Sequence, residues 1–287
     1  MIRQADAAEI PRGPVAYSGE PGAFAEDAVV AAFGDAERLG LPGFRAVFEA
    51  VSRGGARVGV VPIENLVQGT VREVYDLLLE FELVIVGEVV VPVELCLAAL
   101  PGQRLEEVER VYSHVQALGQ AERFLRGRQW DLLTTYNTAG SGRLIVDAGE
   151  RGAAAVLSRR AATRLGLEVL ADGIQDVADN RTRFVVVARE GAMERTGDPG
   201  SPLRTTIAFA VRNEPGTLLA GLRAFADRGI NLSKLESRPS RTAAGEYVFL
   251  ADLDADAADP GCAVAIDDLR GVATMVRILG SYPRGDG

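Results

Sequence analysis

The fold of this chain is constrained most by a repeated alternation, over residues 14–190, of short apolar runs with amphipathic helical patterns. VAYSG from Val15 is followed by AEDAVVAAFG, RVGVVP from Arg57 by VREVYDLLLEF, and AAAVLS from Ala153 by RRAATRLGL. Such alternation predicts an α/β architecture with mainly parallel strands and with ligands bound at their carboxyl ends. A segment of this size also allows two lobes with a cleft between them, which is a common place for a ligand.

The pattern changes after residue 190. Residues 191–203, GAMERTGDPGSPL, combine Gly, Pro, Ser and charges without an apolar period, so we expect a linker there. Over residues 204–282 the predicted order is strand, helix, two strands, helix and strand, from RTTIAFAVRN through PGTLLAGLRAFADRG, INLSKLESRPS, GEYVFLADLDA and CAVAIDDLRG to ATMVRILGSY. This β-α-β-β-α-β order is a ferredoxin-like plan. The sequence therefore predicts two domains, 14–190 and 204–282, joined by a linker.

Charge and cysteine content limit the partners and the compartment. The net charge is −9, and there is no basic stripe with interleaved aromatic residues. We therefore expect no nucleic-acid partner, whereas an anionic small molecule could still bind at a local cluster of arginines. Cys96 and Cys262 lie far apart, without metal-ligand or CxxC spacing. We expect both to be reduced and buried in a cytoplasmic protein.

No membrane segment is predicted. Residues 1–13 mix charges with small residues and lack the apolar core of a signal peptide. The most apolar stretch, residues 83–100, contains Glu88, Pro92 and Glu94. These interior charges oppose a membrane span, and the Val-rich pieces favour two strands joined by a bend.

Several motifs that define common kinds of catalytic or cofactor site are missing from the sequence. The sequence has no GxGxxG fingerprint after its first strand, and no P-loop, HExxH or GxSxG. His114 is its only histidine, so neither a Ser-His-Asp triad nor a multi-histidine metal site can be argued from the sequence. We therefore expect a site without metal or cofactor, made of hydroxyls, amides, a carboxylate and arginines.

One polar cluster lies in VVPIENLVQGTVREVYDLL, residues 60–78. Its apolar strand ends at Pro62, and Glu64 and Asn65 follow before a helix that we expect to begin near Gln68. Polar side chains at the end of a strand and beside a helix N-terminus can bind an anion. The plain alternative is that Asn65 is a turn residue and Glu64 a solvated loop charge.

Two further clusters also follow predicted strands. In VYSHVQALGQAERFL, Ser113 can cap a helix on which Gln116 and Gln120 share one face. In YNTAGSGRL, Asn137 and Thr138 lie at another strand-to-helix turn. Taken singly, each of these is only a capping pattern, and His114 is interpreted as a surface or interface residue rather than as a catalytic base.

The fourth cluster opens the stretch DNRTRFVVVARE, residues 179–190. Phe184 begins an unbroken apolar run that predicts a buried strand. That strand is entered through two guanidiniums, Arg181 and Arg183, that flank the hydroxyl of Thr182. Arg183 can hold a ligand carboxylate in bidentate geometry or, alternatively, form a buried structural ion pair.

Taken together and in this order, the clusters resemble the prephenate dehydratase family. Its N-x-T-R-F signature stands at residues 180–184 and is preceded by a similar GIQD at 173–176. Its PIEN-x-x-x-G element stands at 62–69, its SHPQAL element at 113–118 and its D-T-A-G turn, here Asn-Thr-Ala-Gly, at 137–140.

The smaller domain resembles the ACT regulatory domain of these enzymes. GTLL at residues 216–219 replaces the usual GAL-type loop, and ESRP stands at 236–239. The resemblance covers Val15 to about Tyr282. It implies a two-lobed, periplasmic-binding-protein-like α/β catalytic domain followed by a ferredoxin-like ACT domain.

The activity that the resemblance implies is that of a carbon–oxygen lyase of phenylalanine biosynthesis. Family enzymes remove water and carbon dioxide from prephenate to give phenylpyruvate, and phenylalanine acts as effector. Leu66 and Val115 stand where the family usually has Ser and Pro. Three alternatives stay open: an arogenate dehydratase that forms phenylalanine directly, a non-catalytic amino-acid sensor, for which Leu66 is the main support, and an ACT-bearing prephenate dehydrogenase, which the missing dinucleotide motif opposes.

The resemblance also implies roles for individual residues. It implies that Thr182 is the catalytic hydroxyl and that Asn65 and Gln120 are its neighbours in a proton relay. It implies no cofactor or metal. The residues implied in substrate binding are Glu64, Ser113, Thr138, Arg183 and Phe184, the last packing on the substrate ring. Phenylalanine is expected between two ACT domains of a homodimer or homotetramer, near Gly216, Leu218, Asn231, Glu236, Ser237, Arg238 and Pro239. The plain alternative is that Gly216 only starts a helix and Asn231 only ends a turn.

Overall fold

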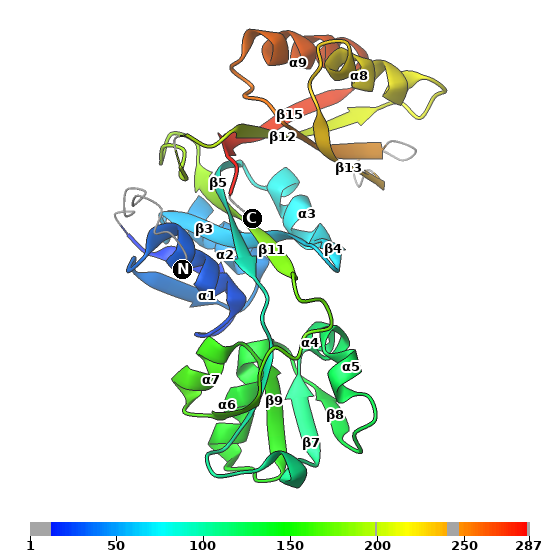
Figure 1. The fold of residues 1–287 in the computed structure, drawn as a ribbon. Helices are drawn as coiled ribbons and strands as arrows, with labels where there is room; N and C mark the ends of the chain where they lie inside the picture. Colours follow the sequence, from blue (N-terminus) through cyan, green and yellow to red (C-terminus); the bar gives the residue numbers. More distant parts are fainter. Residues whose placement is uncertain (1–12, 199, 240–246, 286–287) are drawn as a thin grey trace.

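The computed structural model describes residues 13–198, 200–239 and 247–285. The expectation that residues 1–12 lack a signal peptide lies outside this part. Figure 1 shows a C-terminal domain, a first lobe and a second lobe arranged in a row, with the first lobe in the middle. This arrangement confirms the predicted two-lobed α/β unit followed by a ferredoxin-like domain.

The first lobe is built on a six-stranded sheet with the order β2-β1-β3-β11-β5, in which β4 pairs with β3. One face is covered by α1, and the opposite face packs against α2 and α3. The first-lobe elements are β1 (Val15–Ser18), α1 (Phe24–Phe33), β2 (Arg38–Leu41), α2 (Phe44–Ser52), β3 (Val58–Asn65), β4 (Gly69–Thr70), α3 (Arg72–Glu80), β5 (Leu83–Pro92) and β11 (Arg181–Arg189).

The second lobe is built on a five-stranded sheet with the order β10-β6-β9-β7-β8. The core strand β9 is entirely buried because its short apolar side chains pack against helices on both faces. The second-lobe elements are β6 (Cys96–Ala99), a 3-10 turn (Leu105–Glu107), β7 (Arg110–Ser113), α4 (Val115–Gln120), α5 (Glu122–Leu125), β8 (Asp131–Thr134), α6 (Thr138–Ala148), β9 (Ala153–Leu157), α7 (Arg159–Leu165) and β10 (Glu168–Ala171).

Strand direction differs in part from the sequence expectation of mainly parallel strands. Pairs β1–β2, β1–β3, β7–β8 and β7–β9 are parallel. Strand β11, in contrast, is antiparallel to both of its neighbours, and β6 is antiparallel to β9. The chain crosses between the lobes twice, and the strand on which it enters each lobe, β6 or β11, runs against the parallel set. The predicted pair of strands in residues 83–100 is confirmed as β5 and β6, one on each side of the first crossing.

The helix expected near Gln68 begins later, at Arg72. The intervening residues form a tight hairpin between β3 and β4 instead. The side-chain oxygen of Asn65 accepts hydrogen bonds from the backbone N–H groups of Val67 and Gln68, at 3.1 and 3.0 Å. Gly69 then adopts a φ of +78°, a conformation that glycine enters without steric cost.

The C-terminal domain is a four-stranded antiparallel sheet with the order β13-β14-β12-β15 and two helices on one face. The β-α-β-β-α-β order predicted from the sequence is confirmed. Its elements are β12 (Leu203–Val211), α8 (Thr217–Ala226), β13 (Leu232–Pro239), β14 (Tyr247–Leu253), α9 (Pro260–Val272) and β15 (Met275–Pro283).

The helix-free face of the C-terminal sheet packs on the first lobe. Ala208, Leu250, Leu279 and Tyr282 are fully buried in the same apolar cluster as the α2 and α3 side chains. The backbones come close at Gly280, where an added Cβ atom would lie 2.1 Å from the carbonyl oxygen of Ile85 in β5. The two units therefore share one core rather than touching through a wet interface.

The segment predicted as a linker is attached to the first lobe at Thr196. The Thr196 side chain is buried, and its backbone N–H donates to the carbonyl of Val86 in β5 at 2.7 Å. Both cysteines are free and buried, as expected from the sequence. No helix in residues 13–198, 200–239 and 247–285 is long and apolar enough to cross a membrane.

We predict that Gly280→Ala destabilises the protein, because the new methyl group must push the two backbones apart. Overpacking of this kind costs about 1–3 kcal/mol, to be measured as a lower midpoint in urea unfolding. Gly271→Ala is the matched control: its Cβ meets open space at the end of α9. It should leave the protein unchanged or stabilise it by about 0.5–1 kcal/mol. Equal behaviour of the two variants would contradict the close contact.

Candidate active site

The side chains of Asn65 and Thr182 meet where β3 ends and β11 begins. The two residues are paired across the antiparallel ladder. The Asn65 side-chain amide donates to the Thr182 hydroxyl at 2.9 Å, and each residue is 8% exposed. The structure thus brings together two of the three predicted catalytic residues, which are 117 positions apart in the sequence.

The Asn65 amide group is held on both sides. Its nitrogen also donates to the side-chain oxygen of Asn180 at 3.0 Å, while its oxygen holds the β3–β4 hairpin. Because Thr182 accepts from Asn65, the proton of its own hydroxyl stays available for another acceptor. Asn65 therefore orients the hydroxyl, and Thr182 is the group able to donate.

Asn180 is a further member of this cluster that the sequence reasoning did not assign to the site. It is 2% exposed, and its side-chain nitrogen has no hydrogen-bond partner among the described residues. A buried donor without a partner is unusual in a folded protein. The signal was present in the sequence, since Asn180 lies two positions before Thr182 in the same polar cluster.

The Asn65–Thr182 pair lies directly beside the two crossings between the lobes. The backbone N–H of Val93 in one crossing donates to the carbonyl of Asn180 in the other at 2.8 Å. Ile174 N–H donates in turn to the carbonyl of Leu95 at 3.0 Å. The two crossing segments are therefore bonded to each other, and the candidate site lies beside the place where the chain passes between the lobes (Figure 1).

Gln120 contacts the second crossing between the lobes through its main chain. Its carbonyl accepts from the N–H of Asp176, in the second crossing, at 2.6 Å. Its side chain is half-buried and makes no hydrogen bond to Asn65 or Thr182 or to any other described residue. Its place in a proton relay stays a prediction.

A pocket of about 210 Å³ lies between the lobes at the N-terminus of α6. Phe24 of the first lobe and His114 and Thr138 of the second lobe line it. Asn137 caps α6 by accepting from the N–H of Gly140, as the sequence predicts. Thr138 is therefore placed in the interlobe cleft, next to the positive end of a helix.

Ser113 does not take the place expected for it. It is fully buried, and its hydroxyl donates to the carbonyl of Val156 at 2.6 Å within the second-lobe sheet. The residue that caps α4 is His114, whose Nδ1 accepts from the N–H of Gln116 at 3.3 Å. The helix starts one residue later than predicted because β7 includes Ser113 as its last residue.

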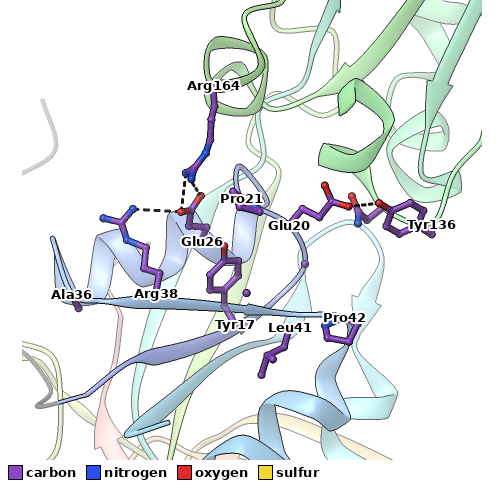
Figure 2. A pocket seen from close by; sticks show the side chains of 13 residues that line it. Tyr17, Glu20, Pro21, Glu26, Ala36, Arg38, Leu41, Pro42, Tyr136 and Arg164 are labelled. Atoms are coloured by element: carbon purple, nitrogen blue, oxygen red, sulfur yellow. Dashed lines mark hydrogen bonds and ion pairs between the residues drawn. The ribbon is translucent and has the colours of Figure 1, made fainter. Parts of the chain in front are cut away.

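A larger pocket of about 560 Å³ continues from the smaller one and shares Tyr136 and Asn137 with it. Figure 2 shows Glu26 between the guanidiniums of Arg38 and Arg164, which lie 3.4 and 3.1 Å away. Arg164 belongs to the second lobe and Glu26 to the first. The pocket therefore lies across both lobes, with its strongest charges already paired.

Glu20 provides a second contact across this pocket. Its carboxylate accepts from the Tyr136 hydroxyl of the second lobe (Figure 2). It also accepts from the Arg143 guanidinium of the second lobe at 3.0 Å. The hydrogen bond from Tyr136 is the main reason why the pKa of Glu20 is lower than usual. These contacts hold the rim of the cleft together without using the Asn65–Thr182 pair.

Arg183 faces away from Thr182, as alternation along a strand requires. Its guanidinium lies 3.1 Å from the carboxylates of Glu64 and Glu88 and 2.7 Å from that of Asp252 in the C-terminal domain. The side chain of Arg183 is only 11% exposed. This geometry differs from the expected contact with a substrate carboxylate and matches the alternative, a buried ion pair.

Glu64 and Phe184 have partners within the protein, and their roles in substrate binding stay predictions. Glu64 accepts from Arg183 at 3.1 Å and from Lys234 at 2.8 Å, on the face of the sheet opposite Asn65. Phe184 is 2% exposed and packs in the apolar cluster between the sheet and α1. Both side chains are occupied within the protein, which leaves Thr138 as the predicted substrate ligand that lines a pocket.

The charges around Arg183 shift one another's protonation. Burial alone would raise the pKa of Glu64, but the hydrogen bond and charge of Lys234, with the charge of Arg183, lower it overall. Burial likewise opposes the charged form of Arg183, yet the Asp252 carboxylate raises its pKa. A carboxyl with a lowered pKa stabilises the fold above its unfolded value of about 4.3 and loses that contribution as the pH falls further. The contact with the C-terminal domain should therefore weaken in acid.

The predicted effector residues do not meet within one copy of the chain. Gly216 is exposed at the start of α8 with a φ of +89°, whereas Asn231 lies beyond its other end and donates to Asp254 at 2.7 Å. A helix of 10 residues is about 15 Å long. Leu218 packs toward the core of the domain, and Arg238 binds Asp76 of α3 at 3.1 Å.

Comparisons with known proteins identify the family. The family profile described as "Prephenate dehydratase" matches residues 15–192, and the profile described as "ACT domain" matches residues 205–260. The chain therefore belongs to the prephenate dehydratase family, whose members are carbon–oxygen lyases.

The chain is similar to curated plant proteins and to solved bacterial structures. "Arogenate dehydratase/prephenate dehydratase 1, chloroplastic" of Arabidopsis thaliana is 38% identical over 94% of this chain and 71% of that protein. Across the plant relatives, the chain spans 66% to 72% of their lengths. The prephenate dehydratase of Arthrobacter aurescens in complex with L-Phe is 34% identical, with a TM-score of 0.86 over 95% of this chain and 90% of that chain. A structure described as "GqqA- a novel type of quorum quenching acylases" is 32% identical, with a TM-score of 0.86 over 95% of this chain and 98% of that chain.

We predict that Arg183→Lys lowers stability and leaves substrate affinity nearly unchanged. An ammonium group cannot reach three carboxylates as a guanidinium does, and a lost charged hydrogen bond costs about 1.5–3 kcal/mol. Urea unfolding measures the loss, and KM should stay within about threefold because no substrate contact is removed. Arg181→Lys is the matched control, since among the described residues the Arg181 guanidinium pairs only with the exposed Asp179. A large rise in KM at unchanged stability would restore the substrate-binding role.

Proposed function

We propose that the protein is a prephenate dehydratase, which removes water and carbon dioxide from prephenate to give phenylpyruvate, and that phenylalanine regulates it. The observation that carries this proposal is the Asn65–Thr182 hydrogen bond of 2.9 Å beside the interlobe crossings. It places an oriented hydroxyl donor in a chain of this family. The free, buried cysteines fit a cytoplasmic location.

In this mechanism Thr182 assists the departure of the ring hydroxyl. The C–O bond breaks as the oxygen receives a proton and leaves as water. The electron pair of the carboxylate C–C bond enters the ring, carbon dioxide leaves, and the ring becomes aromatic. A Thr hydroxyl is a weak acid, so its contribution depends on position, which Asn65 fixes from one side.

The cleft also offers a place for the substrate's negative charge. Thr138 lies at the first position of α6, an 11-residue helix, where backbone N–H groups and the helix dipole favour an anion. The pocket at this helix end includes Phe24, whose ring can lie against the substrate ring. With Arg183 bound to carboxylates, this helix terminus is the better candidate for holding a carboxylate.

Arogenate is the alternative substrate, because several relatives bear that name. The sensor alternative rests on Leu66, whose side chain is 68% exposed at the β3–β4 hairpin. An acylase activity, which is the one named for the similar GqqA structure, would need an activated nucleophile. Here the only histidine caps α4 through its Nδ1, and Ser113 beside it donates to a backbone carbonyl. We therefore favour the dehydratase.

Regulation by phenylalanine follows the likeness to the Arthrobacter aurescens protein, which was solved with L-Phe. The separation of Gly216 from Asn231 along α8 supports a pocket built from two copies, in which each copy supplies one end. We therefore propose a homodimer or homotetramer.

The central test is turnover of prephenate and of arogenate by the purified chain and its Thr182 variants. Thr182→Ala should lower kcat by roughly 10²-fold or more, the scale for a positioned proton donor. Thr182→Ser keeps the hydroxyl and should retain most of the activity. Absence of turnover with both substrates, alongside measurable binding, would favour the sensor. Normal turnover by Thr182→Ala would exclude Thr182 from the mechanism.

The effector site is tested by Gly216→Val. No heavy atom lies within 4 Å of a Cβ at this position, but a side chain is strained at its φ of +89° and would occupy the helix start. Calorimetry should show that phenylalanine binding is lost, while turnover without effector stays within about twofold. Gly102→Val, at a φ of +74° in the second lobe, introduces the same strain elsewhere and should leave phenylalanine binding intact. A full phenylalanine response in Gly216→Val would contradict the site.

A further inference from the structure

The ends of β3 and β11 present different groups on their two faces. On one face lie Asn65 and Thr182, bonded to each other at 2.9 Å. The next pair along the ladder, Glu64 with Arg183, points to the opposite face, where the C-terminal domain packs. Residues next to one another in sequence thus connect the candidate active site with the C-terminal sheet.

The C-terminal domain holds Arg183 through Asp252 of β14. Their contact is 2.7 Å, and the Asp252 side chain is 2% exposed. The other oxygen of Asp252 accepts from Thr206 at 2.7 Å, and Thr206 is bonded to the Tyr282 hydroxyl at 2.6 Å. Asp252 is therefore fixed by its own sheet, so that any shift of the sheet moves the carboxylate on which Arg183 rests.

A second contact from the same domain reaches Glu64. Lys234 of β13 donates to the Glu64 carboxylate at 2.8 Å and to the Thr70 hydroxyl at 2.7 Å. Its side chain is 10% exposed. The C-terminal domain therefore contacts the residue before Asn65 on β3 and the residue after Thr182 on β11.

We propose that Asp252 and Lys234 of the C-terminal domain are positioning residues for the dehydratase reaction, which act on Thr182 through Arg183 and on Asn65 through Glu64. This inference rests on the proposed function and adds to it two residues outside the catalytic domain. A change in the C-terminal sheet, such as the one an effector would cause, would move Arg183 and Glu64. These residues are next in sequence to Thr182 on β11 and to Asn65 on β3.

The local backbone allows such a movement. The ladder between β11 and β3 shifts its register between Arg183 and Phe184, leaving Ile63 as an extra residue on β3. Bulges of this kind re-aim neighbouring side chains beside functional sites. A misplacement of about 1 Å can cost on the order of 10²-fold in rate. A modest shift of Arg183 is therefore enough to change turnover.

The test compares the full chain with Asp252→Asn and with Arg277→Gln. Asparagine keeps the shape of Asp252 and its bond from Thr206 but removes the charge opposite Arg183. Arg277 is the control because it also connects the two units, donating to the carbonyls of Leu79 and Phe81 at 3.1 and 2.6 Å, away from the ends of β3 and β11. Loss of Arg277 loosens the same interface at a distance from the site.

For Asp252→Asn we expect kcat to fall at least tenfold, with KM within threefold. Without any ligand, backbone amides of residues 181–184 should exchange hydrogen at least tenfold faster. Arg277→Gln should keep kcat within twofold and leave that exchange unchanged. Lys234 lies closer to the surface than Asp252, and Lys234→Gln should also lower kcat. If Asp252→Asn does not fold, the kcat of Lys234→Gln decides the outcome.

Unchanged kcat and exchange in both Asp252→Asn and Lys234→Gln would overturn the proposal. Equal losses in Arg277→Gln would also overturn it, because they would show only a loosened interface. If the parent protein turns over neither prephenate nor arogenate, the proposed function fails. The exchange of residues 181–184 then still decides whether Asp252 holds this strand.

Discussion

The insertion of β11 between β3 and β5 is the interaction on which the rest of the structure depends. This strand comes last to the first-lobe sheet, after the chain has built the whole second lobe, and it runs antiparallel to both neighbours. Its first residues bring Thr182 to Asn65 and Arg183 to Glu64, and its end leads into the segment that attaches the C-terminal domain. Catalytic geometry, lobe connection and domain packing therefore share one strand.

Much of the fold and part of the candidate site could be predicted from the sequence. The alternation of apolar runs and helical patterns predicted the element order, since each pattern reports which face of an element is buried. The polar clusters at strand ends contained Asn65 and Thr182, and the family resemblance gave these two residues their expected roles. Asn137 was readable as a helix cap because it lies at a predicted strand-to-helix turn. These features depend only on near neighbours in the chain.

The features of the site that the sequence did not predict depend mostly on contacts between residues that are distant in sequence. Arg183 was open to two interpretations because Asp252, its closest carboxylate, lies in another domain, and only the folded sheet shows which face of β11 it occupies. His114 rather than Ser113 caps α4, because β7 extends one residue further than predicted, and local patterns do not resolve a difference of one residue. Gln68 entered a hairpin rather than a helix because Asn65 bonds the turn.

The late arrival of β11 has a consequence during synthesis on the ribosome. Strands β3 and β5 are complete by residue 92, but the strand that separates them begins about 90 residues later, at Arg181. At roughly 5–20 residues per second, the nascent first lobe waits on the order of 5–20 s with two apolar strand edges unpaired. The pairing of β3 directly with β5 is the misfolding event that this gap invites, and β11 can insert only once the second lobe brings its exit close to its entrance.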